Sequence, residues 1–100
     1  MTIKLVKRPP KGAELRLEGR MDSTSAPAAQ EAFLKVAGEY AQIEPNFTQL
    51  SYVSSAGLRA LLALQKQVNR TGGSLTVTNV SPAIMEAFEM SGFADILRIE

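Results

Sequence analysis

Two stretches near the start of the chain alternate apolar and charged residues, which predicts a pair of β-strands. They are Ile3–Lys7 and Glu14–Glu18, the second with Leu15 and Leu17 on one side. A period of two is typical of a strand with one buried face. The segment between them, Arg8–Gly12, contains two prolines and a glycine, so we expect an antiparallel β-hairpin.

Three later segments carry apolar residues at helical spacing. They run from Pro27 to about Glu39, from Ser55 to about Arg70, and from Ser81-Pro82 to Ser91-Gly92. Spacings of three and four residues place the apolar side chains on one face of each helix. Hydroxyl caps, first-turn prolines and terminal glycines are typical of helix boundaries. The apolar faces comprise Ala29, Phe33, Val36 and Tyr40, then Leu58, Leu61, Leu62 and Val68, then Ile84, Met85 and Phe88.

Three short apolar segments between and after these helices predict further strands, at Ile43–Phe47, Ser74–Val80 and Phe93–Ile99. The first contains Pro45, which cannot donate to a sheet ladder and is rare in a central strand. The predicted order is β-β-α-β-α-β-α-β, and strands joined through helices run parallel with right-handed crossovers. We therefore expect one α/β domain over residues 1–100, with a mixed four- to five-stranded sheet packed with helices.

Composition excludes several classes of function. The chain has no histidine and no cysteine, which excludes serine–histidine catalysis, histidine-ligated metals and disulfides. No phosphate-binding loop is present, and Gly72-Gly73 has the character of a turn. We therefore expect a protein that is not an enzyme and needs no cofactor or metal.

Charge and hydropathy narrow the partners and the compartment. A net charge of +1 gives no electrostatic basis for direct nucleic-acid binding. The longest apolar run, Ala60–Leu64, is far shorter than the ~20 residues of a membrane-spanning helix, and the first residues lack the apolar run of a signal peptide. We expect a cytoplasmic protein without membrane insertion.

The turn Ser54-Ser55-Ala56-Gly57 is the segment with the clearest capacity for chemistry. It lies at the start of the second predicted helix, where one serine would cap the free amides. The small residues Ala56 and Gly57 would leave the hydroxyls accessible to another protein. The turn is thus either a structural cap alone or a modifiable hydroxyl at a docking surface.

A basic stripe continues from this turn along the same helix. Arg59, Lys66 and Arg70 follow Ser55 at spacings of i+4, i+11 and i+15, so they share its face. The stripe is either a solvated outer face or a surface that meets an acidic partner. A phosphate on Ser55 would add roughly −1.5 to −2 charge. That charge is tolerated at a helix N-terminus with Arg59 one turn on, so it would change a binding surface and not the fold.

Over nearly its whole length the chain resembles the STAS family, and specifically bacterial anti-sigma factor antagonists. The segments that carry the resemblance are Leu17–Ser23 followed by Ala26-Pro27, Leu50–Arg59, Ser74–Val80 and Ser91-Gly92-Phe93. Two departures stand out. Ser54 takes the place of an aspartate found in many members, and Asn46-Phe47-Thr48 replaces an Asp-Leu-Ser-like strand end.

The resemblance implies a partner switch. The unmodified protein would bind an anti-sigma factor serine kinase of the histidine-kinase-like ATPase fold. That kinase would inactivate it by phosphorylating Ser55, and a PP2C-type phosphatase would restore it. Asp22 lies in the loop that sits beside the acceptor serine in the family. The expected partner-binding residues are Asp22, Ser23, Ser54, Ser55, Ala56, Gly57, Arg59 and Lys66.

Two alternatives to the switch remain. Some STAS proteins are accessory subunits of the ATPase in a lipid-transport ABC complex, and such a subunit has less reason to keep the acceptor turn. Ser55 with Arg59 therefore favours the switch. Weak nucleotide binding or hydrolysis by the domain itself ranks last, because the chain has no phosphate-binding loop.

Overall fold

The fold is built on a five-stranded sheet, shown by a computed structural model that describes residues 1–100. Its strands, in both chain and spatial order, are β1 (Thr2–Arg8), β2 (Gly12–Met21), β3 (Gln42–Val53), β4 (Ser74–Val77) and β5 (Arg98–Ile99). β1 and β2 pair antiparallel, and every other pair is parallel. The predicted α/β class, the opening hairpin and the parallel centre are confirmed.

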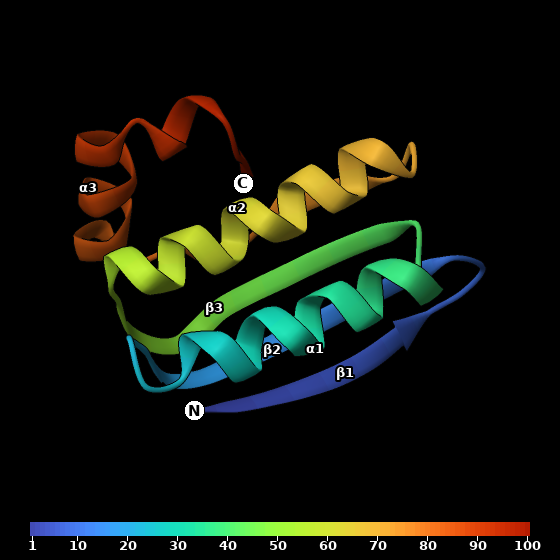
Figure 1. Ribbon diagram of the computed structural model, residues 1–100, viewed down its shortest axis with the longest axis horizontal. Coiled ribbons are helices and arrows are strands. Elements are labelled where there is room, and N and C mark those ends of the chain that lie inside the picture. Colours follow the sequence, from blue (N-terminus) through green and yellow to red (C-terminus); the bar gives the residue numbers. More distant parts are fainter.

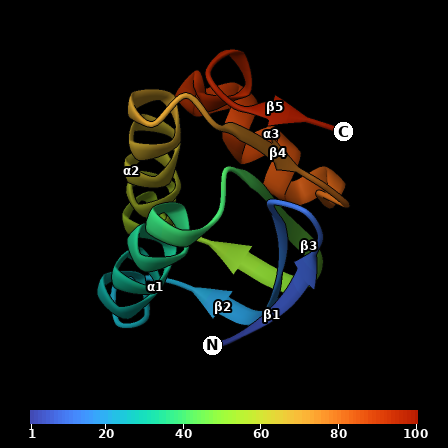
Figure 2. The ribbon, with the colours of Figure 1, turned by 90° about the vertical axis from the view of Figure 1, so that its right-hand side faces the viewer.

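The helices α1 (Ala26–Glu39) and α2 (Ser55–Arg70) lie side by side over one face of β1, β2 and β3 (Figures 1 and 2). The third, α3 (Pro82–Ser91), connects β4 to β5. The core between sheet and helices includes Leu15, Leu17, Phe33, Phe47, Leu61, Leu64 and Phe88, all at most 1% exposed. The opposite face of β1–β3 carries no helix, and its side chains are mostly polar.

β3 is longer than the predicted strand Ile43–Phe47, and it continues to the hydroxyl turn. Its register against β2 shifts twice, once between Arg16 and Glu18 and once between Gly19 and Arg20. Each shift is a bulge that adds one residue to β3. The inward positions therefore change spacing from two to three, through Phe47, Leu50 and Val53. Because strict alternation ends at Phe47, the second half of the strand was not predicted from the sequence.

Pro45 is buried in this central strand despite its missing N–H. It pairs with Leu15 of β2, and on its other side the β3–β4 ladder is interrupted. Gln42 and Ile43 pair with β4, and the next contact is a single bridge from Asn46 to Thr78. Because no ladder donor is required where the pairing is broken, proline is tolerated there.

The predicted last strand, Phe93–Ile99, is wrong over most of its length. Gly92 ends α3 in the left-handed region at φ 81°, and Phe93–Asp95 forms a short 3₁₀ helix, η1. Only Arg98–Ile99 pairs with β4. Ile96 is 50% exposed while Leu97 is buried, so this apolar run does not present one strand face. β4 is also shorter than predicted, because Asn79 leaves the strand at φ 57°.

Candidate functional site

The serine turn at the start of α2 divides its two hydroxyls between two positions. Ser54 is extended, at φ −88° and ψ 175°, and its Oγ accepts the N–H of Gly57 at 3.2 Å. Its carbonyl oxygen accepts the N–H of Leu58 at 2.9 Å. Ser54 is therefore the helix cap. Ser55 is the first residue of the helix, is exposed to solvent and plays no part in this cap.

Gly57 is buried, and its role in the structure is internal packing. A Cβ at this position would lie 2.7 Å from the carbonyl oxygen of Met21 and 2.9 Å from its Cγ. The missing side chain allows the first turn of α2 to rest directly on the end of β2. Sequence reasoning assigned Gly57 the role of opening the hydroxyls to a partner, whereas the structure uses it to hold the turn against the sheet.

Asp22 organises the loop between β2 and α1. One carboxylate oxygen, Oδ1, accepts the Thr24 hydroxyl at 2.6 Å, the Thr24 N–H at 3.0 Å and the Ser25 N–H at 3.2 Å. The hydrogen bond from the Thr24 hydroxyl, with those from the two backbone amides, lowers the pKa of Asp22. Oδ1 is thus engaged within its own loop, and it shapes the surface that Ser23 presents.

The β2–α1 loop and the serine turn lie next to each other because β2 and β3 end together. Met21 pairs with Val53, and the N–H of Ser54 donates to the Met21 carbonyl oxygen at 2.9 Å. This contact brings Asp22 and Ser23 beside Ser54–Gly57. Lys66 is separate, since eleven residues of α2 place it roughly 16 Å from Ser55 along the helix axis.

A shallow groove of about 570 Å³ runs between the starts of α1 and α2. Ala26, Pro27, Glu31 and Leu34 line it from α1, and Ala56 and Arg59 line it from α2 with Ser23 at the end. The lining combines the short side chains of Ala26 and Ala56 with longer ones such as Gln30. The predicted site residues Ser23, Ala56 and Arg59 therefore line one groove. The groove is also lined by residues of α1 that were not predicted from the sequence.

The predicted basic stripe is exposed along α2. Arg59, Lys66 and Arg70 are all accessible to solvent, and the ion pairs of the structure involve other residues. The first turn of α2 carries no acidic residue. The free amides and the helix dipole there favour an added negative charge, so the local electrostatics suit a phosphate on Ser55.

Arg20 and Tyr52, just before the turn, form a contact that the sequence analysis did not predict. The guanidinium of Arg20 stacks over the Tyr52 ring, with its carbon 4.2 Å from the ring centroid, and Arg20 Nε lies 3.8 Å from Asp22 Oδ2. The two side chains meet because Arg20 and Tyr52 are paired across β2 and β3. The register shift between Gly19 and Arg20 places Arg20 opposite Tyr52. Because this shift cannot be inferred from the sequence, the only signal for the contact was the presence of an aromatic and a cationic residue near the turn.

On the open sheet face, Glu14 is a buried carboxylate held by three side chains. Its Oε1 lies 2.9 Å from Arg8 and 3.1 Å from Arg16, and its Oε2 accepts Asn46 Nδ2 at 2.8 Å. The Asn46 hydrogen bond, with those from the two arginines, lowers the pKa of Glu14 to about 2 against the opposite effect of burial. Asn46 also accepts the Thr48 hydroxyl at 2.6 Å through Oδ1.

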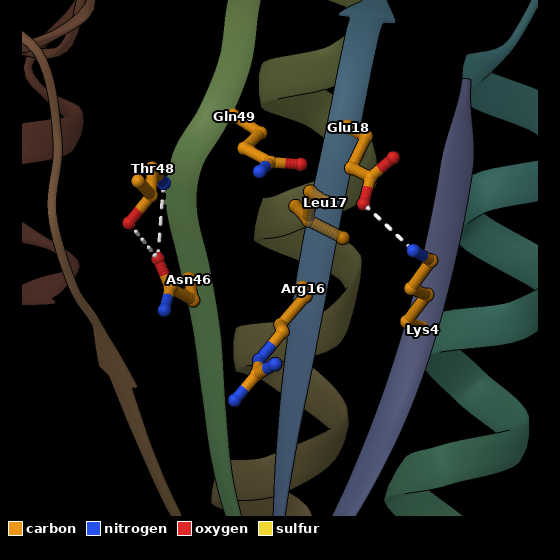
Figure 3. Close-up of a pocket in the computed structure, with 7 residues that line it drawn as sticks. All are labelled: Lys4, Arg16, Leu17, Glu18, Asn46, Thr48 and Gln49. Atoms are coloured by element: carbon orange, nitrogen blue, oxygen red, sulfur yellow. Dashed lines mark hydrogen bonds and ion pairs between the residues drawn. The ribbon is translucent and has the colours of Figure 1, made fainter.

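A polar basin of about 320 Å³ lies on the same open face, between β1 and β3 (Figure 3). Its side chains pair with one another, Lys4 with Glu18 at 3.2 Å and Asn46 with Thr48. The basin shares no lining residue with the serine turn, so the two surfaces are separate.

No group of three or more acidic, histidine or cysteine side chains is arranged to hold a metal ion. None of the α-helices is long and apolar enough to cross a bilayer.

The fold and the turn define a class: a small mixed-sheet α/β domain whose second helix starts at a capped serine with an exposed serine beside it. The chain belongs to the STAS domain family, whose family model matches residues 4–100. The resemblance that the sequence predicted is thereby confirmed.

Several proteins similar to this chain are named as anti-sigma factor antagonists. The anti-sigma-B factor antagonist of Bacillus subtilis (strain 168) is 30% identical over 94 residues, which cover 94% of this chain and 86% of that protein. The anti-sigma factor antagonist SpoIIAA in its unphosphorylated form superposes with a TM-score of 0.78 at 19% identity, covering 99% of this chain and 87% of that one. The Bacillus cell fate determinant SpoIIAA in its phosphorylated form gives a TM-score of 0.77 at 21% identity, covering 99% and 91%.

Proposed function

We propose that this protein is an anti-sigma factor antagonist in a partner-switching pathway that regulates transcription. The observation that carries the proposal is that the two serines at the start of α2 have different roles. Ser54 caps the helix while Ser55, one residue on, is exposed. A hydroxyl that is not needed for the fold is available for modification. The Bacillus subtilis relative named as an anti-sigma-B factor antagonist supports the same role.

In the proposed cycle, the unmodified protein binds an anti-sigma factor serine kinase and thereby frees the sigma factor. The kinase transfers the γ-phosphoryl group of ATP to Ser55 Oγ, the hydroxyl gives up its proton and ADP leaves. A PP2C-type phosphatase then hydrolyses the phosphoserine with water, which restores the hydroxyl and releases phosphate. The domain supplies the acceptor and is not itself the catalyst. That SpoIIAA exists in unphosphorylated and phosphorylated forms is consistent with such a cycle.

The added phosphate acts through charge in this proposal. Roughly −1.5 to −2 units of charge would enter at the N-terminus of α2, one turn from Arg59. The helix end accommodates an anion, so the domain stays folded. A partner that meets Arg59 and the neighbouring surface with acidic groups is repelled. The proposed contact surface comprises Ser23 and the loop that Asp22 shapes, the Ser54–Gly57 turn, Arg59 and, further along, Lys66.

The experiment that tests this function is phosphorylation by each ATPase-fold serine kinase of the source organism with radiolabelled ATP. We expect one kinase to label the wild type and Ser54→Ala, which keeps the acceptor, but not Ser55→Ala. Label on Ser55→Ala would assign another acceptor. No label with any kinase, together with a stable complex with a lipid-transport ABC ATPase, would replace the switch with the accessory-subunit function.

A further inference from the structure

The groove between α1 and α2 contains an exposed leucine that the core does not use. Leu34 is 38% exposed, although the buried face of α1 is formed by Ala26, Ala29, Phe33 and Ala37. Leu34 instead lines the groove, together with the short side chains of Ala26 and Ala56. These three side chains give the groove an apolar part beside polar residues such as Gln30, and its volume of about 570 Å³ has room for a side chain from another molecule.

The two sides of this groove carry opposite charges that do not neutralise each other. Glu31 lines it from α1 and Arg59 lines it from α2, yet neither takes part in an ion pair within the chain. The cationic side continues along α2 through Lys66 and Arg70, both exposed. Unpaired charges beside an exposed apolar side chain such as Leu34 are suited to a partner of complementary charge.

From these observations we infer that the groove is the anchor site for the anti-sigma factor kinase, and that α1 belongs to the docking surface. The inference rests on the proposed function and extends it. The occupant is a kinase segment with an apolar side chain that packs on Leu34, Ala26 and Ala56. An acidic group beside that anchor meets Arg59, and a basic group on its other side meets Glu31.

The position of Ser55 explains how phosphorylation would act on this groove. Ala56, the next residue, lines it, and Arg59 borders it one turn on. A phosphate at Ser55 would therefore stand at the rim on the α2 side, where it competes for Arg59 and repels the acidic flank of the kinase segment. Arg59 would thus interact with the phosphate in the modified protein and with the kinase segment in the unmodified protein. Leu34 would contact only the kinase segment.

The test measures the affinity of the kinase that labels Ser55 for groove variants, by calorimetry, with melting temperatures recorded alongside. Leu34→Ser and Glu31→Arg are expected to weaken binding about tenfold or more with unchanged melting temperatures. The matched controls lie outside the groove. Met90→Ser changes a side chain that is 82% exposed on α3, and Glu39→Arg changes an exposed carboxylate at the end of α1; both should bind like the wild type.

The outcomes separate this inference from the function on which it rests. If Leu34→Ser and Glu31→Arg both bind with wild-type affinity while Ser55→Asp loses binding, the groove is not the docking site. The proposed phosphorylation switch would still stand. If no ATPase-fold kinase binds the wild type, the switch and the groove both fall. Because Glu31 and Leu34 are both exposed, neither variant depends on repacking of the core.

Discussion

Gly57 lies so close to Met21 that the start of α2 and the end of β2 are in direct contact, with a Cβ position only 2.7 Å from the Met21 carbonyl oxygen. That same oxygen accepts the N–H of Ser54 at 2.9 Å. The sheet therefore fixes both the cap and the first turn. The exposed Ser55 between them is held on a rigid support, which suits a residue that must be presented to another protein in one geometry.

Replacing Gly57 by alanine should destabilise the domain by about 1–3 kcal/mol, the usual cost of overpacking, because the new methyl group meets backbone as well as side-chain atoms. The free energy of unfolding, from urea denaturation, measures the effect. Gly38→Ala is the matched control, since nothing lies within 4 Å of its Cβ position and alanine stabilises a helix by roughly 0.5–1 kcal/mol relative to glycine. Equal stabilities of Gly57→Ala and wild type would contradict the close packing.

The two serines of the turn should differ in their contribution to stability. Ser54→Ala removes the side chain that accepts the Gly57 N–H and should cost about 1 kcal/mol. Ser55→Ala removes an exposed hydroxyl and should leave the free energy of unfolding nearly unchanged. Thermal unfolding of the two variants side by side makes the comparison. A larger loss for Ser55→Ala would mean that Ser55 is a structural residue, contrary to its proposed role.

Asn46→Asp should destabilise the domain at neutral pH. The amide of Asn46 donates to Glu14 Oε2 at 2.8 Å, and aspartate would replace that donor by a second carboxylate. Loss of the partner of a buried group costs about 1–3 kcal/mol, and the added negative charge should raise the pKa of Glu14. NMR titration of the Glu14 carboxyl carbon reports the second effect. Gln49→Glu adds the same charge on the same face without touching Glu14, and should change neither quantity.

The lowered pKa of Glu14 predicts a specific loss of stability in acid. The pKa falls from an ordinary value of 4.5 to about 2, so the folded state favours the ionised form. The resulting stabilisation is complete above about pH 4.5 and is lost as the pH falls towards 2. Urea denaturation between pH 6 and pH 2 should show a steeper decline for the wild type than for Glu14→Gln. Asp22 also has a lowered pKa, but it is present in both proteins. Parallel curves would contradict the network.

The sequence predicted the parts of the fold that follow a strict period. The hairpin, the three helices and the parallel centre all have apolar residues at spacings that the structure retains. β3 is different, because its two bulges change the spacing of inward residues after Phe47. A bulge depends on the partner strand, so its position cannot be inferred from β3 alone. The predicted strand over Phe93–Ile99 was wrong because these apolar residues do not share one buried face: Leu97 is buried while its neighbour Ile96 is 50% exposed.

The part of the candidate site that lies in one continuous segment of the chain could be predicted from the sequence. Ser54–Gly57 and the following helix show the cap, the exposed hydroxyl and the basic stripe in local sequence. The contribution of α1 was not predictable, since Leu34 lies outside the apolar stripe of its own helix and gains meaning only beside Ala56 and Arg59. The packing of Gly57 on Met21 likewise depends on a contact between residues distant in sequence.

In the proposed switch, a negative charge at Ser55 weakens partner binding strongly and leaves the fold intact. The most direct measurement compares Ser55→Asp with Ser55→Asn, which has nearly the same shape without the charge, for affinity to the labelling kinase and for melting temperature. We expect equal melting temperatures and an affinity at least about tenfold weaker for Ser55→Asp, equivalent to about 1.4 kcal/mol. Equal affinities, or a collapse of the Ser55→Asp melting temperature, would contradict it.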